Sequence, residues 1–339
     1  MENKTSALLS IRDLRIDIKT MDGQLNAVRG VDLLIRKGRT LGLVGESGCG
    51  KSLTSKAILG INPGNCVSRG SIIFHAEEGE KDLLTLKKND LEIRSIRGRR
   101  ISMIFQEPMT AFSPLYTIGN QIEEILLLHV TRDKKQARQM ALDMLSRVGI
   151  ANPEKRIKQY PHEFSGGMLQ RAMIAMAIIC KPELLIADEP TTALDVTIQA
   201  QILQIMQDLQ KEIGMAIFFI THDMGTIASM CDEVAVMYLG QIVESASVRQ
   251  IFHNPLHPYT RGLLASIPKM GMDPDARLAS IHGQVPIPIG LKETCGFYPR
   301  CPLAEERLCL QGPVPLLDVE PGHSARCFKA GQKEAVRDE

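Results

Sequence analysis

Long apolar segments are absent from this chain of 339 residues. Glycine, aspartate or proline interrupts the longest apolar stretches before they reach the roughly 18 residues that a membrane-spanning helix requires. Residues 1–5 are polar, which is unlike the apolar centre of a secretory signal peptide. We therefore expect a soluble, cytoplasmic protein whose contact with any membrane is made through partner proteins.

An excess of one sign of charge is also lacking. The 40 Lys and Arg residues nearly balance the 39 Asp and Glu residues, which leaves a net charge of +1. A protein that holds nucleic acid through about 6–10 phosphate contacts normally carries a basic excess. The composition therefore argues against a nucleic-acid partner, while the length allows about two domains.

A glycine-rich motif is the strongest chemical signal in the chain. Residues 45–52 read G-x-x-x-x-G-K-S directly after the apolar run 41–44. A loop of this kind cradles phosphates with backbone N–H groups, while its lysine reaches the β- and γ-phosphates and its hydroxyl ligates Mg²⁺. We expect a nucleoside triphosphate site, followed by a helix from Lys51 to near Leu59. The predicted loop residues are Gly45, Glu46, Ser47, Gly48, Cys49, Gly50, Lys51 and Ser52.

A second glycine motif, Ser165-Gly166-Gly167, begins a predicted helix that ends near Cys180. Ser165 is a favourable N-cap, and the glycines leave N–H groups accessible at the positive end of the helix. One nucleotide does not need two such sites in one chain, so we interpret this motif as a contact for the nucleotide of another copy. An ordinary serine-capped helix is the alternative reading of this stretch alone.

Two further motifs follow apolar strands at their carboxyl ends. After the strand 184–187, Asp188 suits Mg²⁺ contact and Glu189 suits positioning or deprotonating the attacking water. His222 follows the strand 216–220, where it is placed to contact the γ-phosphate. An acidic pair and a single histidine are each common structural features, so they gain meaning only beside the phosphate loop.

Strands that alternate with helices predict an α/β fold with a doubly wound, largely parallel sheet. Apolar residues recur at helical spacing over 121–149, which we place in a helical subdomain inserted into the core, and again over 198–213. The charged segment 77–88 is expected to be loop, and the arginines within 94–100 are expected to be solvated surface. A closing strand pair is expected over 234–243.

Taken in order, these motifs resemble the nucleotide-binding domain of ABC ATPases over residues 8–247. The resemblance implies a P-loop ABC-type domain at 1–250, with a helical subdomain near 107–180 and an antiparallel β-subdomain. It also implies ATP and Mg²⁺ as cofactors. The matching motifs are the phosphate loop, Gln106, Ser165-Gly166-Gly167, Asp188-Glu189, Ala193-Leu194-Asp195 and His222.

The resemblance implies a role for each of these residues within one subunit. Gln106 would sense the nucleotide and contact the membrane subunits. The catalytic set would be Lys51, Glu189 and His222, and the Mg²⁺ set would be Ser52, Gln106 and Asp188. Across a dimer, Ser165 and Gly167 would clamp the γ-phosphate held by the opposing subunit, and Asp195 would lie at the seam.

Two positions depart from the family pattern. Met168 stands where most members have glutamine, and the phosphate contacts there do not depend on that side chain. No aromatic residue precedes Phe74, so the usual ring that stacks on adenine is missing. This leaves Met21 or Leu25 as the candidates that cover the base.

The segments 106–110, 162–168, 253–268 and 283–286 are similar to the oligopeptide/dipeptide importer branch of the family. This implies an ATP-hydrolysing subunit, paired with a paralogous ATPase subunit or a second copy. Two transmembrane permease subunits would hold it at the cytoplasmic face of the inner membrane, and an extracytoplasmic solute-binding protein would deliver peptide, a nickel complex or oligosaccharide. The alternatives are a soluble ABC ATPase that acts on nucleic acid or ribosomes, and a metal-sensing regulatory module.

Eight cysteines are present, and four of them lie between 295 and 327 in an extension that we place at 251–339. This Pro-rich tail shows little apolar periodicity, so we expect it to have no apolar core and to be held together by a bound metal. Thiolates suit zinc or an iron–sulfur cluster, and the lack of a C-x-x-C pair weighs against a zinc ribbon. Some members of the branch carry a 4Fe-4S cluster here, so cluster, zinc and free thiols stay open for Cys295, Cys301, Cys309 and Cys327. The scattered residues Cys49, Cys66, Cys180 and Cys231 are interpreted as small apolar side chains.

Overall fold

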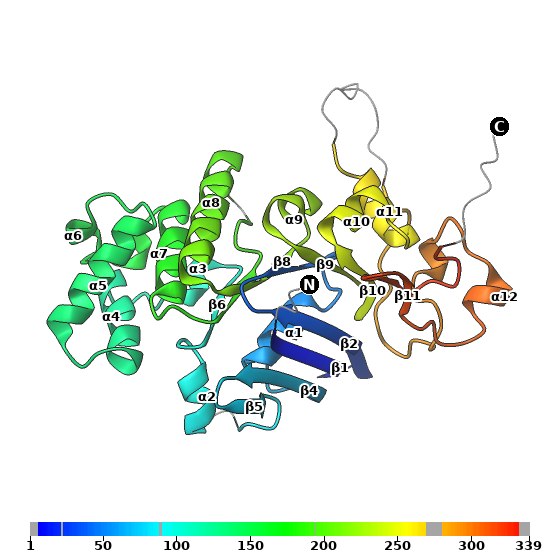
Figure 1. The fold of residues 1–339 in the computed structure, drawn as a ribbon, viewed down its shortest axis with the longest axis horizontal. Coiled ribbons are helices and arrows are strands. Elements are labelled where there is room, and N and C mark those ends of the chain that lie inside the picture. Colours follow the sequence, from blue (N-terminus) through cyan, green and yellow to red (C-terminus); the bar gives the residue numbers. More distant parts are fainter. Residues whose placement is uncertain (1–5, 22, 88–89, 193, 269–279, 332–339) are drawn as a thin grey trace.

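Two β-sheets organise the fold (Figure 1). The computed structural model describes residues 6–21, 23–87, 90–192, 194–268 and 280–331. Within these ranges the central sheet has eight strands in the order β11-β12-β10-β9-β3-β8-β7-β6. Its strands are β3 (Thr40–Val44), β6 (Ile101–Ile104), β7 (Leu184–Asp188), β8 (Ala216–Thr221), β9 (Glu233–Tyr238), β10 (Gln241–Ser247), β11 (Leu317–Glu320) and β12 (His323–Ala325).

Parallel pairing joins the inner strands of the central sheet. β3 lies between β8 and β9, β7 lies between β6 and β8, and each of these pairs is parallel. All residues of β3, β6, β7 and β8 are buried, as expected for parallel strands that are covered on both faces. The predicted largely parallel sheet and the antiparallel closing pair of β9 with β10 are confirmed. The adjoining helices are α1 (Lys51–Ile58), α2 (Leu91–Ile96), α8 (Val196–Ile213) and α9 (Met224–Met230).

The second sheet is antiparallel and has the order β2-β1-β4-β5. The expectation that 77–88 is loop is wrong for β5, which pairs with β4 and places Asp82 opposite Ile73. Its four charged or glycine residues carry no strand pattern, and they are tolerated because β5 is an edge strand with one side toward solvent. The strands are β1 (Ala7–Thr20), β2 (Gly23–Arg36), β4 (Cys66–Ala76) and β5 (Gly79–Asp82).

The arginines after α2 are less solvated than we expected. Arg100 donates to Glu183, over 2.5 Å, and to Glu78, over 2.8 Å. Arg97 donates from Nε to the carbonyl oxygen of Leu59 over 2.7 Å. The interpretation of solvated surface is therefore wrong for these two residues, because partners distant in sequence fix both guanidinium groups.

A group of helices lies between β6 and β7, at the end of the molecule opposite the C-terminal residues (Figure 1). The apolar residues that predicted helices at 121–149 are buried together, with Ile122, Ala141 and Leu145 fully inaccessible. No helix in the described ranges combines the length and apolar character needed to span a bilayer. The helices are α3 (Pro108–Ala111), α4 (Ile118–His129), α5 (Lys134–Arg147), α6 (Pro153–Arg156) and α7 (Gly166–Ile178), with a 3₁₀ turn at Pro161–Glu163.

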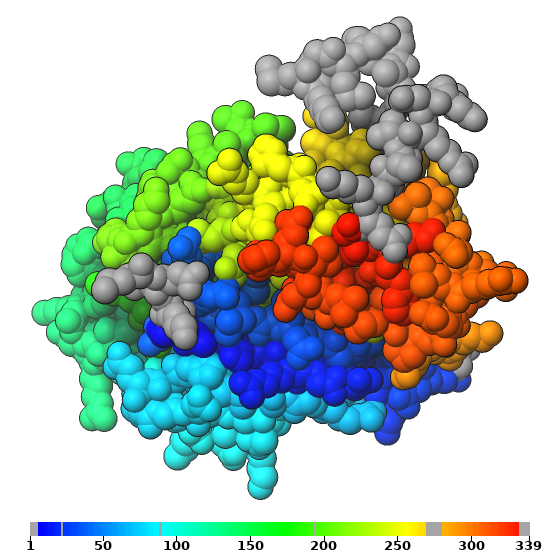
Figure 2. Space-filling view, turned by 45° about the vertical axis from the view of Figure 1, so that its right-hand side comes forward, coloured from blue at the N-terminus to red at the C-terminus, as the bar shows by residue number. Residues whose placement is uncertain are grey.

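The C-terminal segment joins the central sheet instead of standing apart. β12 pairs with β10, and Figure 2 shows the C-terminal residues lying against the N-terminal strands. Phe297 is 3% exposed and packs against the rings of Tyr238 and Tyr259. The expectation of a tail without a core is therefore wrong, because apolar residues of the tail pack against the core formed by the rest of the chain. Its elements are α10 (Val248–His253), α11 (Pro258–Ala265), a 3₁₀ turn at Tyr298–Arg300, α12 (Glu306–Cys309), β11 and β12.

A buried carboxylate fixes this junction. Glu244 of β10 accepts hydrogen bonds from the Leu256 N–H (2.7 Å), the His257 N–H (2.9 Å) and His323 Nε2 (2.7 Å). The side chains of Glu244 and His323 are both fully buried. Burial raises the pKa of Glu244, but the hydrogen bonds outweigh burial and leave the pKa below its ordinary value. The ionised carboxylate therefore holds α11 and β12 onto the sheet.

The pH dependence of folding should report on His257, which is 2% exposed and caps α11 by accepting from the Tyr259 N–H over 3.0 Å. Burial lowers the pKa of His257 from 6.5 to about 4. The unfolded chain therefore binds more protons between these values, and the contribution is complete above pH 6.5 and lost as the pH falls toward 4. His257→Asn keeps a side chain that can accept at the cap but removes the titrating ring. We expect its free energy of unfolding to fall less than that of the wild type over that pH range, by up to about 3 kcal/mol. Urea titrations at several pH values measure this, and parallel pH curves for the two proteins would contradict it.

Candidate functional site

The phosphate loop begins where β3 ends, at the carboxyl edge of the parallel strands. A Cβ on Gly45 would lie 2.1 Å from the carbonyl oxygen of Met237, so no other residue fits there. Gly50 is the N-cap of α1 and has a φ of 106°, a conformation that favours glycine. A Cβ on Gly50 would also lie 2.6 Å from the carbonyl oxygen of Ala27, so contact distance requires both glycines and backbone conformation adds to it at Gly50.

Lys51 is buried, with 5% of its surface exposed. Its Nζ donates to the carbonyl oxygens of Gly45, over 2.7 Å, and Glu46, over 3.1 Å. Cys49 is also buried, and burial raises the pKa of its thiol. The ammonium group of Lys51 therefore lies inside the loop, where it can bind the phosphates of a nucleotide.

Ser52 and Asp188 meet beside the loop. Ser52 Oγ donates to Asp188 Oδ1 over 3.0 Å, which joins the start of α1 to the end of β7. Asp188 is 2% exposed, and burial raises its pKa. A hydroxyl next to a desolvated carboxylate is the donor set that Mg²⁺ prefers when it also binds substrate phosphates. These two residues therefore fit the predicted metal position.

Two of the predicted residues, Gln106 and His222, converge on Glu189, together with Thr192, which was not predicted. Its carboxylate accepts from Gln106 Nε2 over 3.0 Å and lies 3.3 Å from His222 Nδ1. Thr192 Oγ1 donates to the same carboxylate over 3.1 Å. Glu189 has a φ of 48°, which is unusual for a residue with a side chain and is common at functional sites. Gln106 thus reaches the site through its hydrogen bond to Glu189, apart from the Ser52 and Asp188 pair.

The second glycine motif lies at the N-terminus of α7, as predicted. Ser165 accepts from the Met168 N–H over 3.4 Å and is the N-cap, and Ser165 and Gly166 are exposed. Asp195 is likewise the N-cap of α8, accepting from the Ile198 N–H over 2.9 Å. Of the remaining motif, Ala193 lies outside the described residues.

Sequence reasoning missed contacts that reach this site from far along the chain. Gln170, which is 2% exposed, donates from α7 to the carbonyl oxygen of Pro190, next to Glu189. Tyr259 and Arg300 both contact Glu46 of the phosphate loop. The separation from Glu46 is 213 residues for Tyr259 and 254 for Arg300, so no local pattern announces either contact.

The four tail cysteines surround one small cavity, which His257 and Phe297 also line. The Cys295 N–H donates to the carbonyl oxygen of Cys309 over 3.1 Å. Burial raises the pKa of Cys295 to about 11 and also raises the pKa values of Cys301 and Cys327. In the part of the chain that the structure describes, no group of three or more His, Cys, Asp or Glu side chains is arranged to hold a metal ion.

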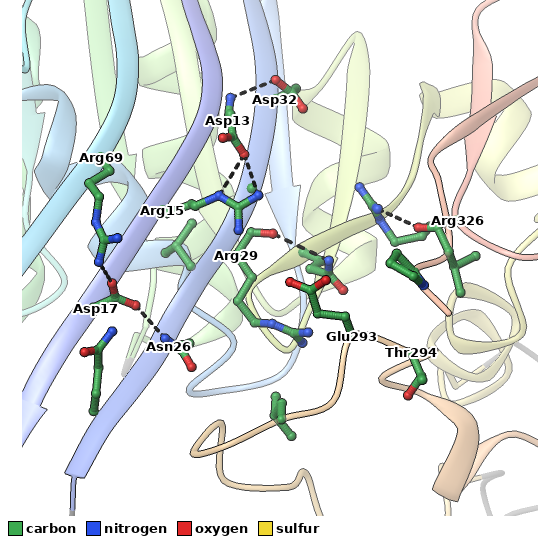
Figure 3. A pocket seen from close by; sticks show the side chains of 17 residues that line it. Asp13, Arg15, Asp17, Asn26, Arg29, Asp32, Arg69, Glu293, Thr294 and Arg326 are labelled. Carbon is green, nitrogen blue, oxygen red and sulfur yellow. Dashed lines mark hydrogen bonds and ion pairs between the residues drawn. The ribbon is translucent and has the colours of Figure 1, made fainter. Parts of the chain in front are cut away.

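A separate polar cavity of about 480 Å³ lies between the antiparallel sheet and the tail (Figure 3). Arg15 pairs with Asp13 over 3.0 Å, and Arg69 pairs with Asp17. Charged residues that line the cavity are therefore neutralised by each other. None of the phosphate-loop residues lines it. The structure therefore places this cavity apart from the predicted nucleotide position.

Comparison with known proteins finds similarity along nearly the whole chain. The family described as ABC transporter matches residues 28–192, and the family described as oligopeptide/dipeptide transporter, C-terminal region, matches 243–309. The oligopeptide transport ATP-binding protein OppD of Escherichia coli (strain K12) is 44% identical over 328 residues, covering 97% of this chain and 95% of that protein. The oligopeptide transport ATP-binding protein AppD of Bacillus subtilis (strain 168) is 48% identical over 325 residues, covering 95% of this chain and 97% of that protein. A dimeric bacterial ABC transporter cassette has a similar fold, with a TM-score of 0.62 at 24% identity, over 71% of this chain and 99% of the other.

The two kinds of glycine in the loop predict different costs of substitution. Gly45→Ala forces a Cβ against a backbone carbonyl, whereas a Cβ on Gly48, whose φ is 80°, meets nothing within 4 Å. We expect Gly48→Ala to lower the free energy of unfolding by about 1–2 kcal/mol from backbone strain alone, and Gly45→Ala to lower it by clearly more. Denaturant titration without nucleotide measures this, and equal losses would contradict the contact argument.

Proposed function

This chain belongs to the family of ATP-binding proteins of oligopeptide/dipeptide ABC transporters, and we propose from its site geometry how it uses ATP to power import. It is an ABC ATPase and the ATP-binding subunit of a peptide importer. The observation that carries the mechanism is the meeting of Lys51, the Ser52 and Asp188 pair, and Glu189 at one edge of the parallel sheet.

Within one subunit, each side chain has a separate task. The loop N–H groups and Lys51 bind the phosphates of ATP. Ser52 and Asp188 would hold Mg²⁺, which supplies charge neutralisation on the phosphate oxygens when bound. Glu189 orients the attacking water and accepts its proton, and His222 holds that carboxylate through its Nδ1. Gln106 contributes through its hydrogen bond to Glu189 and so reports on the state of the nucleotide.

A second ATPase subunit completes the site in this proposal. Ser165 and Gly166 are exposed at the positive end of α7, and they suit a phosphate brought by another chain. In this proposal Ser165, Gly166 and Gly167 contact the γ-phosphate bound by the opposing subunit, and Asp195 lies at the interface between the two subunits. The partner is either a paralogous ATPase, which makes a heterodimer, or a second copy.

Two permease subunits and an extracytoplasmic solute-binding protein complete the importer that we propose, with this chain at the cytoplasmic face of the inner membrane. Apolar side chains that follow Gln106 support a docking surface for the permeases. Met109, Leu115 and Tyr116 are 58%, 79% and 56% exposed. A partner that covers them would sit next to Gln106, so it could pass the nucleotide state to the membrane.

We divide the chain into an ATPase domain at 1–250 and an extension at 251–339. The helical subdomain is assigned to about 107–180, which contains α3 to α7. The peptide-transport names of the relatives and the net charge of +1 favour this function over an ATPase that acts on nucleic acid or ribosomes.

Removing the negative charge of Glu189 tests its assignment. Glu189→Gln keeps the shape and the hydrogen bond to Gln106 but has no basic oxygen, so we expect ATP turnover to fall by about 100-fold or more with ATP affinity retained. Phosphate release and nucleotide binding are measured on the same preparation. Glu212→Gln, on the exposed surface of α8, is the matched control and should turn over normally. Unchanged turnover in Glu189→Gln would remove the role.

The four-cysteine site at 295–327 is retained as a proposal for a 4Fe-4S cluster. Its support is that the four thiols line one common cavity. The described side chains are not arranged as metal ligands, so binding a cluster would require the four thiols to move together. The cluster would act as a structural crosslink of the tail. We expect protein purified without oxygen to contain about four irons and four sulfides per chain, and Cys301→Ala to lose them while Cys66→Ala keeps them. Zinc in place of iron, or neither metal, would overturn the cluster.

A further inference from the structure

An ion pair between Arg300 and Glu46 links the phosphate loop to the C-terminal extension. Arg300 Nη1 donates to Glu46 Oε2 over 2.7 Å, and Arg300 Nη2 donates to Glu46 Oε1 over 3.0 Å. Two parallel bonds between a guanidinium and a carboxylate fix both distance and orientation. Glu46 is the second residue of the phosphate loop, and Arg300 belongs to the C-terminal extension, so the pair joins the two parts of the chain.

Arg300 is rigidly placed. Its side chain is 4% exposed, against 29% for Glu46. Besides the carboxylate, it donates from Nε to the carbonyl oxygen of His282 over 3.0 Å and from Nη1 to Tyr238 Oη over 3.5 Å. Because these contacts are made to residues outside the phosphate loop, the position of the guanidinium does not depend on Glu46 alone.

A second contact from the extension reaches the backbone of the same residue. The Glu46 N–H donates to Tyr259 Oη over 2.9 Å. Tyr259 is fully buried, and its ring lies 4.7 Å from that of Tyr238 and 5.4 Å from that of Phe297, centroid to centroid. The extension therefore holds Glu46 by its side chain and by its main chain.

The held residue lies inside the nucleotide site. Lys51 Nζ donates to the carbonyl oxygen of Glu46 over 3.1 Å, so the position of Glu46 helps to set the position of the phosphate-binding ammonium. Its carboxylate belongs to a residue of the loop that cradles the phosphates, so an unpaired charge there would act on bound ATP at short range. An unpaired carboxylate there would repel ATP, and Arg300 cancels that charge.

We propose that Arg300 is a positioning residue for nucleotide binding, through which the C-terminal extension neutralises Glu46 and holds the phosphate loop ready for ATP. This inference rests on the proposed ATP-binding function and adds a role for the extension in it. Tyr259 supports the same residue through its hydroxyl group. The extension is thereby part of the nucleotide site, although it contains none of the sequence motifs from which that site was predicted.

The test is a charge rescue. Arg300→Met keeps most of the apolar bulk and leaves the Glu46 carboxylate unpaired, and we expect the Kd and KM for ATP to rise by about 10- to 100-fold with a smaller change in kcat. The increase should shrink at high salt, because screening weakens repulsion between the carboxylate and the phosphates. Adding Glu46→Gln to Arg300→Met should restore most of the affinity, since no charge is then left to repel ATP.

Arg326→Met is the matched control. Arg326 is a half-buried arginine of the same extension that donates to the carbonyl oxygens of Ile242 and Val314 and has no bond to Glu46. We expect it to lower the thermal midpoint without raising the Kd for ATP in the protein that stays folded. If Arg300→Met does not fold, Tyr259→Phe removes one hydroxyl and should raise the Kd by about threefold or more.

The outcomes distinguish a failure of the proposed function from a failure of the role of Arg300. Wild-type protein that does not bind ATP would overturn the proposed function. Wild-type protein that binds ATP, with folded Arg300→Met binding equally well, would overturn only the role of Arg300. Loss of affinity that Glu46→Gln fails to rescue would show that Arg300 acts on the fold of the extension and would also overturn the proposal.

Discussion

Parallel pairing of β3, β8 and β7 is the constraint on which the site depends. Parallel strands end at the same edge of a sheet, so the phosphate loop after β3, Asp188 and Glu189 after β7, and His222 after β8 are brought to one place. The register is held by strands whose residues are all buried, so a shift by one residue would exchange the side chains packed on the two faces of the sheet and disrupt the packing of both layers. The chemistry is therefore as precise as the packing beneath it.

Two charged side chains of the nucleotide site, Lys51 and Asp188, are buried. Lys51 and Asp188 are 5% and 2% exposed, and ionised groups are costly to bury unless they are bound on several sides. Lys51 is bound by carbonyl oxygens of its own loop, and Asp188 by the hydroxyl of Ser52. Phosphates and Mg²⁺ would replace weak partners with strong ones, which is a physical reason for such a site to bind a magnesium nucleotide.

The C-terminal extension belongs to the ATPase in a physical sense. β12 extends the central sheet, Glu244 anchors α11 and β12, and Phe297 packs on the rings of Tyr238 and Tyr259. These contacts bring Arg300 to Glu46. A tail that is poor in apolar periodicity can thus be well ordered, because it completes a core that other segments supply.

Local chemistry made much of the site predictable from the sequence. Glycine spacing, the N-cap Ser165, the helical spacing of apolar residues and apolar strands act over a few residues, so the phosphate loop, α7, α8 and the parallel strands could be inferred. The strand β5, the partners of Arg100 and the packing of Phe297 could not, because each depends on a partner distant in the sequence. The contact of Gln106 with Glu189 spans 83 residues and that of Arg300 with Glu46 spans 254. The sequence by itself determined which groups bind phosphate, and only the tertiary structure decided which distant side chains hold those groups, since that choice is made by packing and not by local pattern.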